Sequence, residues 1–167
     1  IIIMSRGFEI VNQENFMYGT KVVAHGVEQI IYPQDKLPIR SDAASAGYDF
    51  YTPIKVTLLP GETKTVWTNV KAYMGPDEVL TLYVRSSVGI KKGVVLANGT
   101  GIVDASYYEN ESNDGNIGIA LKNTTGQSVI FEAGERIAQG IFTKYLIIDE
   151  DEVMNEKRTG GIGSSGS

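Results

Sequence analysis

The residues between 98 and 107 have the types expected of a site for a nucleoside. Asn98 carries an amide that can donate and accept hydrogen bonds, and Gly101 lets the backbone approach a flat ligand. Asp104 can take a proton from water, and the ring of Tyr107 can pack against a sugar or a base. The stretch therefore predicts a nucleoside pocket with a carboxylate beside it.

The same stretch also has a purely structural interpretation. Its glycines can form the turn of a β-hairpin, and Asp104 can accept backbone hydrogen bonds within that turn. On these residues alone the hairpin is the preferred interpretation, so support for a site must come from elsewhere in the chain.

A second group of residues could bind phosphate. Arg85 precedes a short helix predicted over 86–92, in which Ser86 can cap the first backbone N–H groups and the lysines at 91 and 92 suit the negative end of the helix dipole. An arginine, a serine and the N–H groups of a helix start can also hold a phosphate. A capped helical turn and a phosphate site fit these residues equally well.

The C-terminal tail has two interpretations as well. The acidic run at 149–152 is predicted to be solvated, and the glycine-rich stretch after it predicts a disordered end, because it cannot bury enough surface to order itself. Alternatively, the tail could fold over a triphosphate, with a fixed charge from Arg158 and N–H donors from the glycines. It is not a P-loop, because no Gly-Lys-Ser/Thr sequence follows a strand.

Composition narrows the possible functions. The 167 residues suit one domain with a hydrophobic core, and a net charge of -5 argues against a protein that grips nucleic acid by its phosphates. The lack of cysteine excludes disulfides, thiol nucleophiles and thiolate zinc sites, and His25 is the only histidine. The apolar run Ile1–Ile3 is too short for a signal peptide or a membrane span, so we expect a cytoplasmic protein without membrane binding.

Turn signals divide most of the chain into short strands, which predicts an all-β barrel or sandwich. We expect an N-terminal extension over 1–26, a β domain over 27–148, and an acidic linker with a glycine-rich arm over 149–167. Strands are predicted at 28–32, 56–59, 63–73, 79–84, 94–96, 117–122, 128–131 and 136–145.

Five short motifs follow one another along this β pattern, and together they resemble the trimeric dUTPase family, in the form found in Gram-positive bacteria and their phages. The resemblance covers roughly residues 37–166. The motifs are Ala46–Asp49, Arg85–Ser87 with Gly89, Asn98–Tyr107, Gly134–Gln139, and Arg158 with Gly160, Gly161 and Gly163–Gly166.

The resemblance implies a jelly-roll-like fold assembled as a homotrimer, with active sites at subunit interfaces and an arm that closes a site elsewhere in the trimer. It implies Mg²⁺-dependent hydrolysis of dUTP to dUMP and pyrophosphate, which limits uracil incorporation into DNA and supplies dUMP for thymidylate synthesis. A dCTP deaminase of the same fold and a nucleotide-gated regulatory binding protein are the alternatives. The match at Asp104 and Tyr107 and the glycine-rich arm disfavour the deaminase.

The resemblance also implies roles for individual residues. Asp104 would orient and deprotonate the attacking water, with Arg85 and Gln139 as further catalytic residues. Tyr107 would pack under the deoxyribose and leave no room for a 2′-hydroxyl. The other substrate-binding residues that it implies are Ser86, Ser87, Asn98, Gly101, Ile102, Val103, Gly118, Arg158, Gly160, Gly161, Ile162 and Ser164.

Three positions either have an alternative interpretation or depart from the pattern of the family. Asp49 matches an acidic residue that holds Mg²⁺ through water, and a structural role as a turn carboxylate is the alternative. Ile162 stands where the family has an aromatic residue over the uracil, so weaker closure or a higher KM is expected. Arg158 lies one residue closer to the glycine pair than is usual, which makes Lys157 an alternative counterpart.

An insertion, Glu109–Asp114, separates the motif tyrosine from the glycine that normally follows it shortly after. We expect a longer, polar and mobile hairpin tip here, because surface loops lengthen at little entropic cost. A sharper hypothesis is that this insertion, or the N-terminal extension, contacts a regulatory protein partner.

Overall fold

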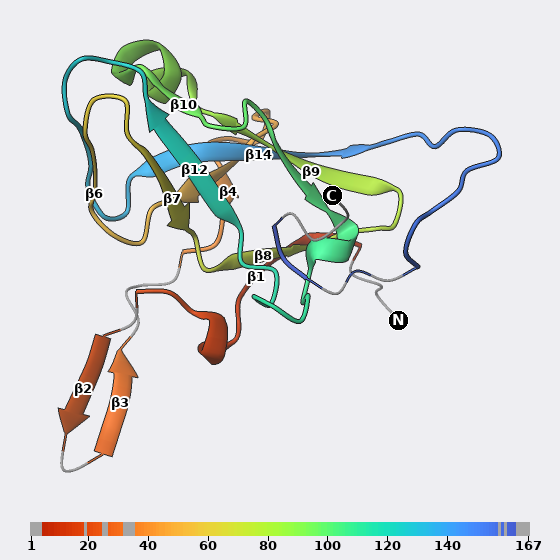
Figure 1. Ribbon diagram of the computed structural model, residues 1–167, viewed down its shortest axis with the longest axis horizontal. Helices are drawn as coiled ribbons and strands as arrows, with labels where there is room; N and C mark the ends of the chain where they lie inside the picture. The colour runs from red at the N-terminus through yellow and green to blue at the C-terminus, as the bar shows by residue number, and fades with distance from the viewer. Residues whose placement is uncertain are drawn as a thin grey trace.

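The protein folds almost entirely into antiparallel strands joined by turns and short helical segments (Figure 1). The computed structural model describes residues 5–18, 20–24, 27–31, 36–156, 158 and 160–162. His25, Lys157 and Ser164, which the sequence analysis singled out, lie outside the described residues. None of the helices in these ranges is long and apolar enough to cross a membrane.

A five-stranded sheet forms one layer of the body. Alternation of buried and exposed residues along β9 (Glu78–Val84) turns one face inward, as the two-residue period of a strand requires. The sheet has the order β11 (Gly101–Asp104), β9, β14 (Arg136–Lys144), β5 (Tyr48–Tyr51) and β4 (Ile39–Arg40).

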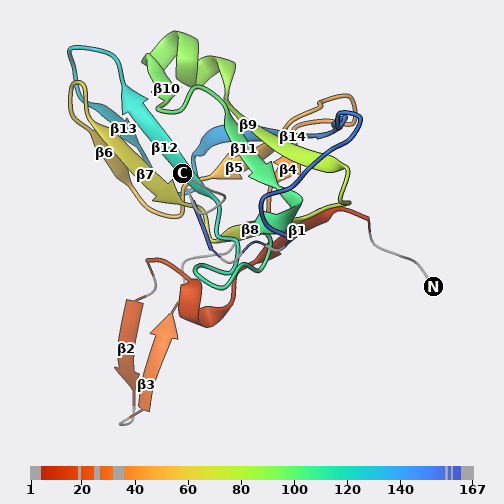
Figure 2. The same cartoon turned by 45° about the vertical axis from the view of Figure 1, so that its right-hand side comes forward.

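A three-stranded sheet forms a second layer, which Figures 1 and 2 show as separate from the first. Its order is β10 (Val94–Leu96), β12 (Gly118–Asn123) and β7 (Thr63–Trp67). A neighbouring pair consists of β6 (Val56–Leu58) and β13 (Val129–Phe131). Phe50, Leu80 and Ile137 from one side and Ile119 and Leu121 from the other belong to one buried cluster, so the prediction of an all-β sandwich is confirmed.

The N-terminal segment is partly tied to this body. β1 (Gly7–Ile10) pairs with β8 (Val70–Tyr73), and a short helical turn, η1 (Gln13–Asn15), follows it. A separate hairpin of β2 (Thr20–Ala24) and β3 (Val27–Ile31) extends away from the body in both views. The expected extension therefore contributes a strand to the domain.

The prediction of one strand over 63–73 is wrong. The chain breaks between β7 and β8 at Asn69, whose φ of 62° lies in the left-handed region. The buried Asn69 donates its backbone N–H to Asn116 Oδ1 at 2.9 Å and its side-chain amide to the carbonyl of Met17 at 2.9 Å. These long-range bonds redirect the chain, so β7 and β8 enter different sheets.

The predicted short helix exists as a π-helical turn, η2 (Ser87–Lys91). The expected cap does not form, because Ser86 already has helical dihedral angles and its side chain makes no capping hydrogen bond. The hydroxyl of Ser86 is therefore not used to cap the start of the turn, and the residue lines a hollow described below.

Candidate active site

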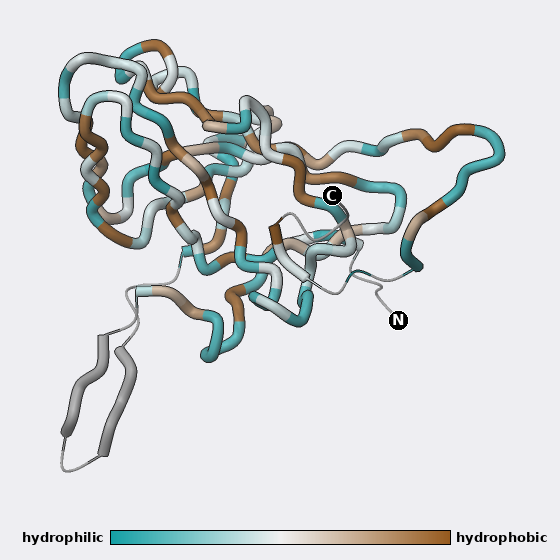
Figure 3. Tube along the Cα trace, viewed as in Figure 1, coloured by the Kyte–Doolittle hydropathy of each residue, from teal (hydrophilic) through white to brown (hydrophobic). Residues whose placement is uncertain are grey.

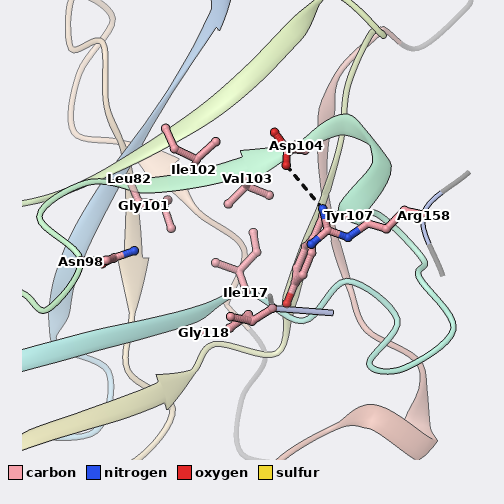
Figure 4. Close-up of a pocket in the computed structure, with 11 residues that line it drawn as sticks. Leu82, Asn98, Gly101, Ile102, Val103, Asp104, Tyr107, Ile117, Gly118 and Arg158 are labelled. Carbon is pink, nitrogen blue, oxygen red and sulfur yellow. Dashed lines mark hydrogen bonds and ion pairs between the residues drawn. The ribbon is translucent and has the colours of Figure 1, made fainter. Parts of the chain in front are cut away.

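The residues of the predicted nucleoside pocket come together in one hollow of about 230 Å³, which we call the β11 hollow (Figure 4). It lies between β11, the edge strand of the five-stranded sheet, and the start of β12 in the other sheet. Its lining residues are Leu82, Asn98, Gly101, Ile102, Val103, Asp104, Tyr107, Ile117, Gly118, Arg158 and Ile162.

The backbone of β11 is placed by close packing on β9. Gly101 stands opposite Leu82, and a Cβ on Gly101 would lie 2.8 Å from the Cβ of Leu82, so a larger residue would push the strand away. Gly99 has a φ of +74° in the preceding turn. Val103 is buried and Ile102 exposed. Because β11 is the edge strand, one side of its backbone has no neighbouring strand in this sheet and can meet a ligand.

Asp104 ends β11 with its carboxylate beside the hollow. Its side chain is 54% exposed and its Oδ2 lies 3.4 Å from Nη1 of Arg158. Asp104 makes no capping hydrogen bond to the helical turn η3 (Ala105–Tyr107) that follows. The carboxylate is therefore not used to cap η3, and it lines the hollow, where it could activate water.

Tyr107 is buried, and both hydrogen-bonding positions of its hydroxyl are used. Oη donates to the carbonyl of Asn116 at 2.6 Å and accepts from Nδ2 of Asn113 at 2.8 Å. Burial raises the pKa of Tyr107 above its ordinary value near 10, against the opposing effects of the Asn113 hydrogen bond and the Arg158 charge. The ring is thus a neutral, fixed wall of the hollow.

The C-terminal arm reaches this hollow within the same chain. The guanidinium of Arg158 lies 5.2 Å from the centre of the Tyr107 ring, and its side chain is only 10% exposed. Arg158 also donates to the carbonyls of Gly160 at 2.7 Å and Gly161 at 2.8 Å. Ile162 of the arm completes the lining of the hollow.

The residues of the predicted phosphate site meet in a second hollow of about 420 Å³, the β5 hollow. Asp49 on β5 is buried there, and its Oδ1 lies 3.0 Å from Nε of Arg85 while its Oδ2 lies 3.2 Å from Nη1 of Arg136. Ser41 donates to the same Oδ2 at 3.1 Å. The lining residues are Ser41, Ser45, Gly47, Asp49, Arg85, Ser86, Ser87, Ile90, Lys91 and Gln139.

The two hollows share no lining residue. Within one chain, the residues implied to bind the nucleoside are therefore separated from those implied to bind phosphate. The arm contributes Arg158 and Ile162 to the β11 hollow, while Gly160 and Gly161 act there as acceptors for Arg158.

The expectation of a mobile hairpin tip at Glu109–Asp114 is wrong. Asn110 and Asp114 are buried, and Lys71 of β8 bonds to Glu109 at 2.9 Å and to Asp114 at 3.0 Å. Burial lowers the pKa of Lys71, but the hydrogen bonds from its ammonium to the two carboxylates outweigh this effect and raise it. The insertion is a folded element packed against the body.

Sequence reasoning missed the side chains that hold the β11 hollow in place. Lys71 interrupts the apolar run of β8, and Asn110, Asn113 and Asn116 recur at intervals of three residues beyond Tyr107. A lysine in a buried strand and a series of amides are both signals of a satisfied polar network. Their partners are distant in sequence, so the pattern alone does not reveal them.

Comparison with known proteins identifies the class to which this fold and site belong. A family model described as dUTPase matches residues 34–166. The chain belongs to the dUTPase family.

Individual relatives agree with this assignment. The deoxyuridine 5′-triphosphate nucleotidohydrolase of Lactococcus lactis subsp. lactis (strain IL1403) is 42% identical over 163 residues, which cover 97% of this chain and 98% of the relative. The solved dUTPase of Streptococcus mutans is 40% identical, with a TM-score of 0.71, and the match covers 86% of this chain and 98% of that one. The dUTPase of the Staphylococcus aureus phage phi11 has a TM-score of 0.65 at 20% identity over 90% and 97% of the chains, and shows a shared fold.

Proposed function

We propose that the protein hydrolyses dUTP to dUMP and pyrophosphate. The observation that carries this proposal is the β11 hollow, in which the amide of Asn98, the carboxylate of Asp104 and the ring of Tyr107 meet around one accessible strand edge. Asn98 and the backbone of Ile102, Val103 and Gly118 would read the uracil. The fixed ring of Tyr107 would stand under the deoxyribose.

Asp104 is proposed as the general base. Its exposed carboxylate can hold a water and accept a proton as that water attacks the α-phosphorus. Nη1 of Arg158 lies 3.4 Å from Oδ2 of this carboxylate. We infer that Arg158 leaves Asp104 for the phosphates when the nucleotide binds, which frees Oδ2 to hold the water.

The β5 hollow is proposed to hold the phosphate chain. Arg85, Ser86, Ser87 and Gln139 line it and can supply a charge, hydroxyls and an amide to phosphate oxygens. The side chain of Gln139 passes over Gly47, where any Cβ would collide with it. The first-motif glycine therefore makes room for the fourth-motif glutamine.

The contacts of Asp49 bear on its proposed role toward Mg²⁺. Two guanidinium groups within 3.2 Å neutralise this buried carboxylate, which opposes direct coordination of a cation, and no cluster of three acidic, histidine or cysteine side chains suited to a metal occurs among the described residues. The donor set therefore does not fit a resident metal. We propose that Asp49 orients Arg85, and that Mg²⁺ arrives on the phosphates of dUTP, with any contact to Asp49 made through water.

A homotrimer with sites at subunit interfaces is proposed from two features. The β5 and β11 hollows are separate within one chain, so a complete site requires two hollows from different subunits to meet. The segment after β14 is also apolar, as Figure 3 shows. It is exposed as well, with Leu146 97%, Ile147 70% and Ile148 75% accessible. Such a segment suits burial against another copy.

A regulatory partner at the insertion is a separate proposal. Glu109, Asn110, Asn113 and Asp114 are engaged with this chain's own residues, so a partner would have to recognise the exposed surface at Glu111 and Ser112.

The function is tested by pyrophosphate release from dUTP, UTP, dCTP and dTTP, with and without Mg²⁺. We expect rapid Mg²⁺-dependent turnover of dUTP alone, because the amide and backbone groups of the β11 hollow match uracil and the ring of Tyr107 excludes a ribose. Binding of dUTP without turnover would contradict hydrolysis and favour a regulatory protein, and deamination of dCTP would favour the deaminase.

A further inference from the structure

The insertion Glu109–Asp114 contacts the hydroxyl of Tyr107, whose side chain lines the β11 hollow. Asn113 Nδ2 donates to Tyr107 Oη at 2.8 Å, while Oη donates to the carbonyl of Asn116 at 2.6 Å. A phenol held by one donor and one acceptor cannot move its oxygen without losing a bond. The tilt of the ring in the hollow is therefore set from its far end.

The amide of Asn113 is itself held in one orientation. Its Oδ1 accepts from Nδ2 of Asn110 at 2.7 Å and from the backbone N–H of Gly115 at 3.0 Å. The same Nδ2 of Asn110 donates to the backbone carbonyl of Tyr107 at 2.8 Å. Because its oxygen faces two donors, Asn113 presents its nitrogen to the hydroxyl of Tyr107.

Both ends of the insertion are anchored to β8 through Lys71, whose side chain is 8% exposed. Lys71 Nζ lies 2.9 Å from Oε1 of Glu109 and 3.0 Å from Oδ2 of Asp114, and this Oδ2 also accepts the backbone N–H of Asn12 at 2.7 Å. The insertion thus cannot shift relative to the sheets without breaking a buried ion pair.

The insertion also lies against the C-terminal arm. A Cβ on Gly161 would be 2.8 Å from Oγ of Ser112 and 3.2 Å from Nδ2 of Asn113. The amide nitrogen that holds the ring of Tyr107 therefore lies beside the arm that covers the same hollow.

We propose that the insertion is a specificity element, in which Asn113 is a positioning residue that acts through the Tyr107 hydroxyl. By fixing the ring under the sugar, Asn113 sets the discrimination between 2′-deoxyribose and ribose nucleoside triphosphates. A ring free to tilt would open space for a 2′-hydroxyl. This inference rests on the proposed function, because it concerns selection at the same hollow.

The test compares kcat/KM for dUTP with kcat/KM for UTP in the parent, Asn113→Ala, Tyr107→Phe and the double variant. The ratio of the two values does not depend on how much of a preparation is folded, so a merely structural defect leaves it unchanged. Loss of one hydrogen bond predicts a fall of about two- to tenfold in this ratio for Asn113→Ala. In the Tyr107→Phe background, Asn113→Ala should add little, because the hydroxyl through which it acts is absent.

Two further variants complete the experiment. Glu111→Gln changes an exposed residue of the same insertion and should leave the ratio unchanged. Asn113→Asp keeps the oxygen that Asn110 and Gly115 use but removes the donor to Tyr107, so it should lower the ratio even if Asn113→Ala folds poorly.

An unchanged ratio in Asn113→Ala or Asn113→Asp, with dUTP still hydrolysed, would overturn the inference and leave the proposed function standing. The inference would also be overturned if the effects of Asn113→Ala and Tyr107→Phe on this ratio were fully additive in the double variant. A folded parent that does not hydrolyse dUTP would instead overturn the proposed function, and this inference with it.

Discussion

The two hollows are built in different ways, although both are lined by polar side chains. The β11 hollow is formed mainly by backbone and by neutral side chains, with Tyr107 held by the Asn113 amide and the Asn116 carbonyl, and its one ion pair, Asp104 with Arg158, lies where the C-terminal arm meets it. The β5 hollow is formed by charge, with Asp49 buried between Arg85 and Arg136. Neutral groups in fixed positions can select a base and a sugar by shape, whereas charges can hold phosphates regardless of the nucleoside.

Deleting Glu109–Asp114 is expected to damage the β11 hollow most. The deletion would leave the buried ammonium of Lys71 without its two carboxylates and the hydroxyl of Tyr107 without its donor. We expect a loss of about 2 kcal/mol in the free energy of unfolding, because the pair of Lys71 with Asp114 is buried whereas Glu109 is half exposed and contributes less. This corresponds to a fall of roughly 4–8 °C in Tm, with lower activity toward dUTP.

The matched control for the deletion is Glu111→Ala, which removes an exposed side chain from the same insertion. Its Tm and its kinetics with dUTP should equal those of the parent. A deletion variant that kept the Tm and the dUTP kinetics of the parent would show that the insertion does not support the β11 hollow and is available for a partner.

Asp49→Asn tests whether the β5 hollow depends on charge. The substitution leaves Arg85 and Arg136 without their counter-charge, so we expect a loss of about 1 kcal/mol in stability and roughly a tenfold fall in kcat/KM for dUTP as Arg85 loses its orientation. Thermal unfolding and pyrophosphate release measure the two effects. An unchanged Tm together with a raised Mg²⁺ requirement would contradict the positioning role and support a role in holding the metal.

Ile162→Phe tests whether the β11 hollow binds the base through the shape of its lining side chains. Ile162 lines this hollow, and an aromatic side chain there could stack on the uracil. The gain of about 0.5–1.5 kcal/mol typical of aromatic pairs predicts a KM for dUTP lower by about two- to tenfold. If steady-state kinetics show no change in KM or kcat, the arm covers the base in another way.

The smallest expected effect is a dependence of stability on acid pH. The hydrogen bond from Lys71 holds the pKa of Glu109 below its ordinary value of 4.5, so its contribution to stability is complete above that value and is lost as the pH falls through the lower pKa of the folded state. Hydrogen bonds from Gly75 and Arg6 lower the pKa of Glu78 in the same direction.

The parent should therefore lose Tm as the pH falls below about 4.5, and Glu109→Gln should show a flatter dependence over the same range. Thermal unfolding between pH 3 and pH 7 measures both. Parallel curves for the two proteins would show that the pair with Lys71 contributes nothing to stability.

The chemistry of both hollows could be predicted from the sequence because local residue types carry it. Tyr107 lies three positions after Asp104, and a single strand followed by a helical turn brings them to one hollow. The supports could not be predicted, because they come from distant parts of the chain. Lys71 meets Asp114 43 residues away, and Asn69, which ends the predicted long strand, is held by Met17 and Asn116.

The most direct test of the account is pyrophosphate release from dUTP by Asp104→Asn beside the parent. The substitution removes the proposed base but keeps the shape of the hollow, since the carboxylate is exposed and its partner is the arm residue Arg158. We expect kcat to fall by at least ~10²-fold while Tm stays that of the parent. An Asp104→Asn enzyme that turned over dUTP at the parent rate would contradict the assignment of the β11 hollow as the catalytic centre.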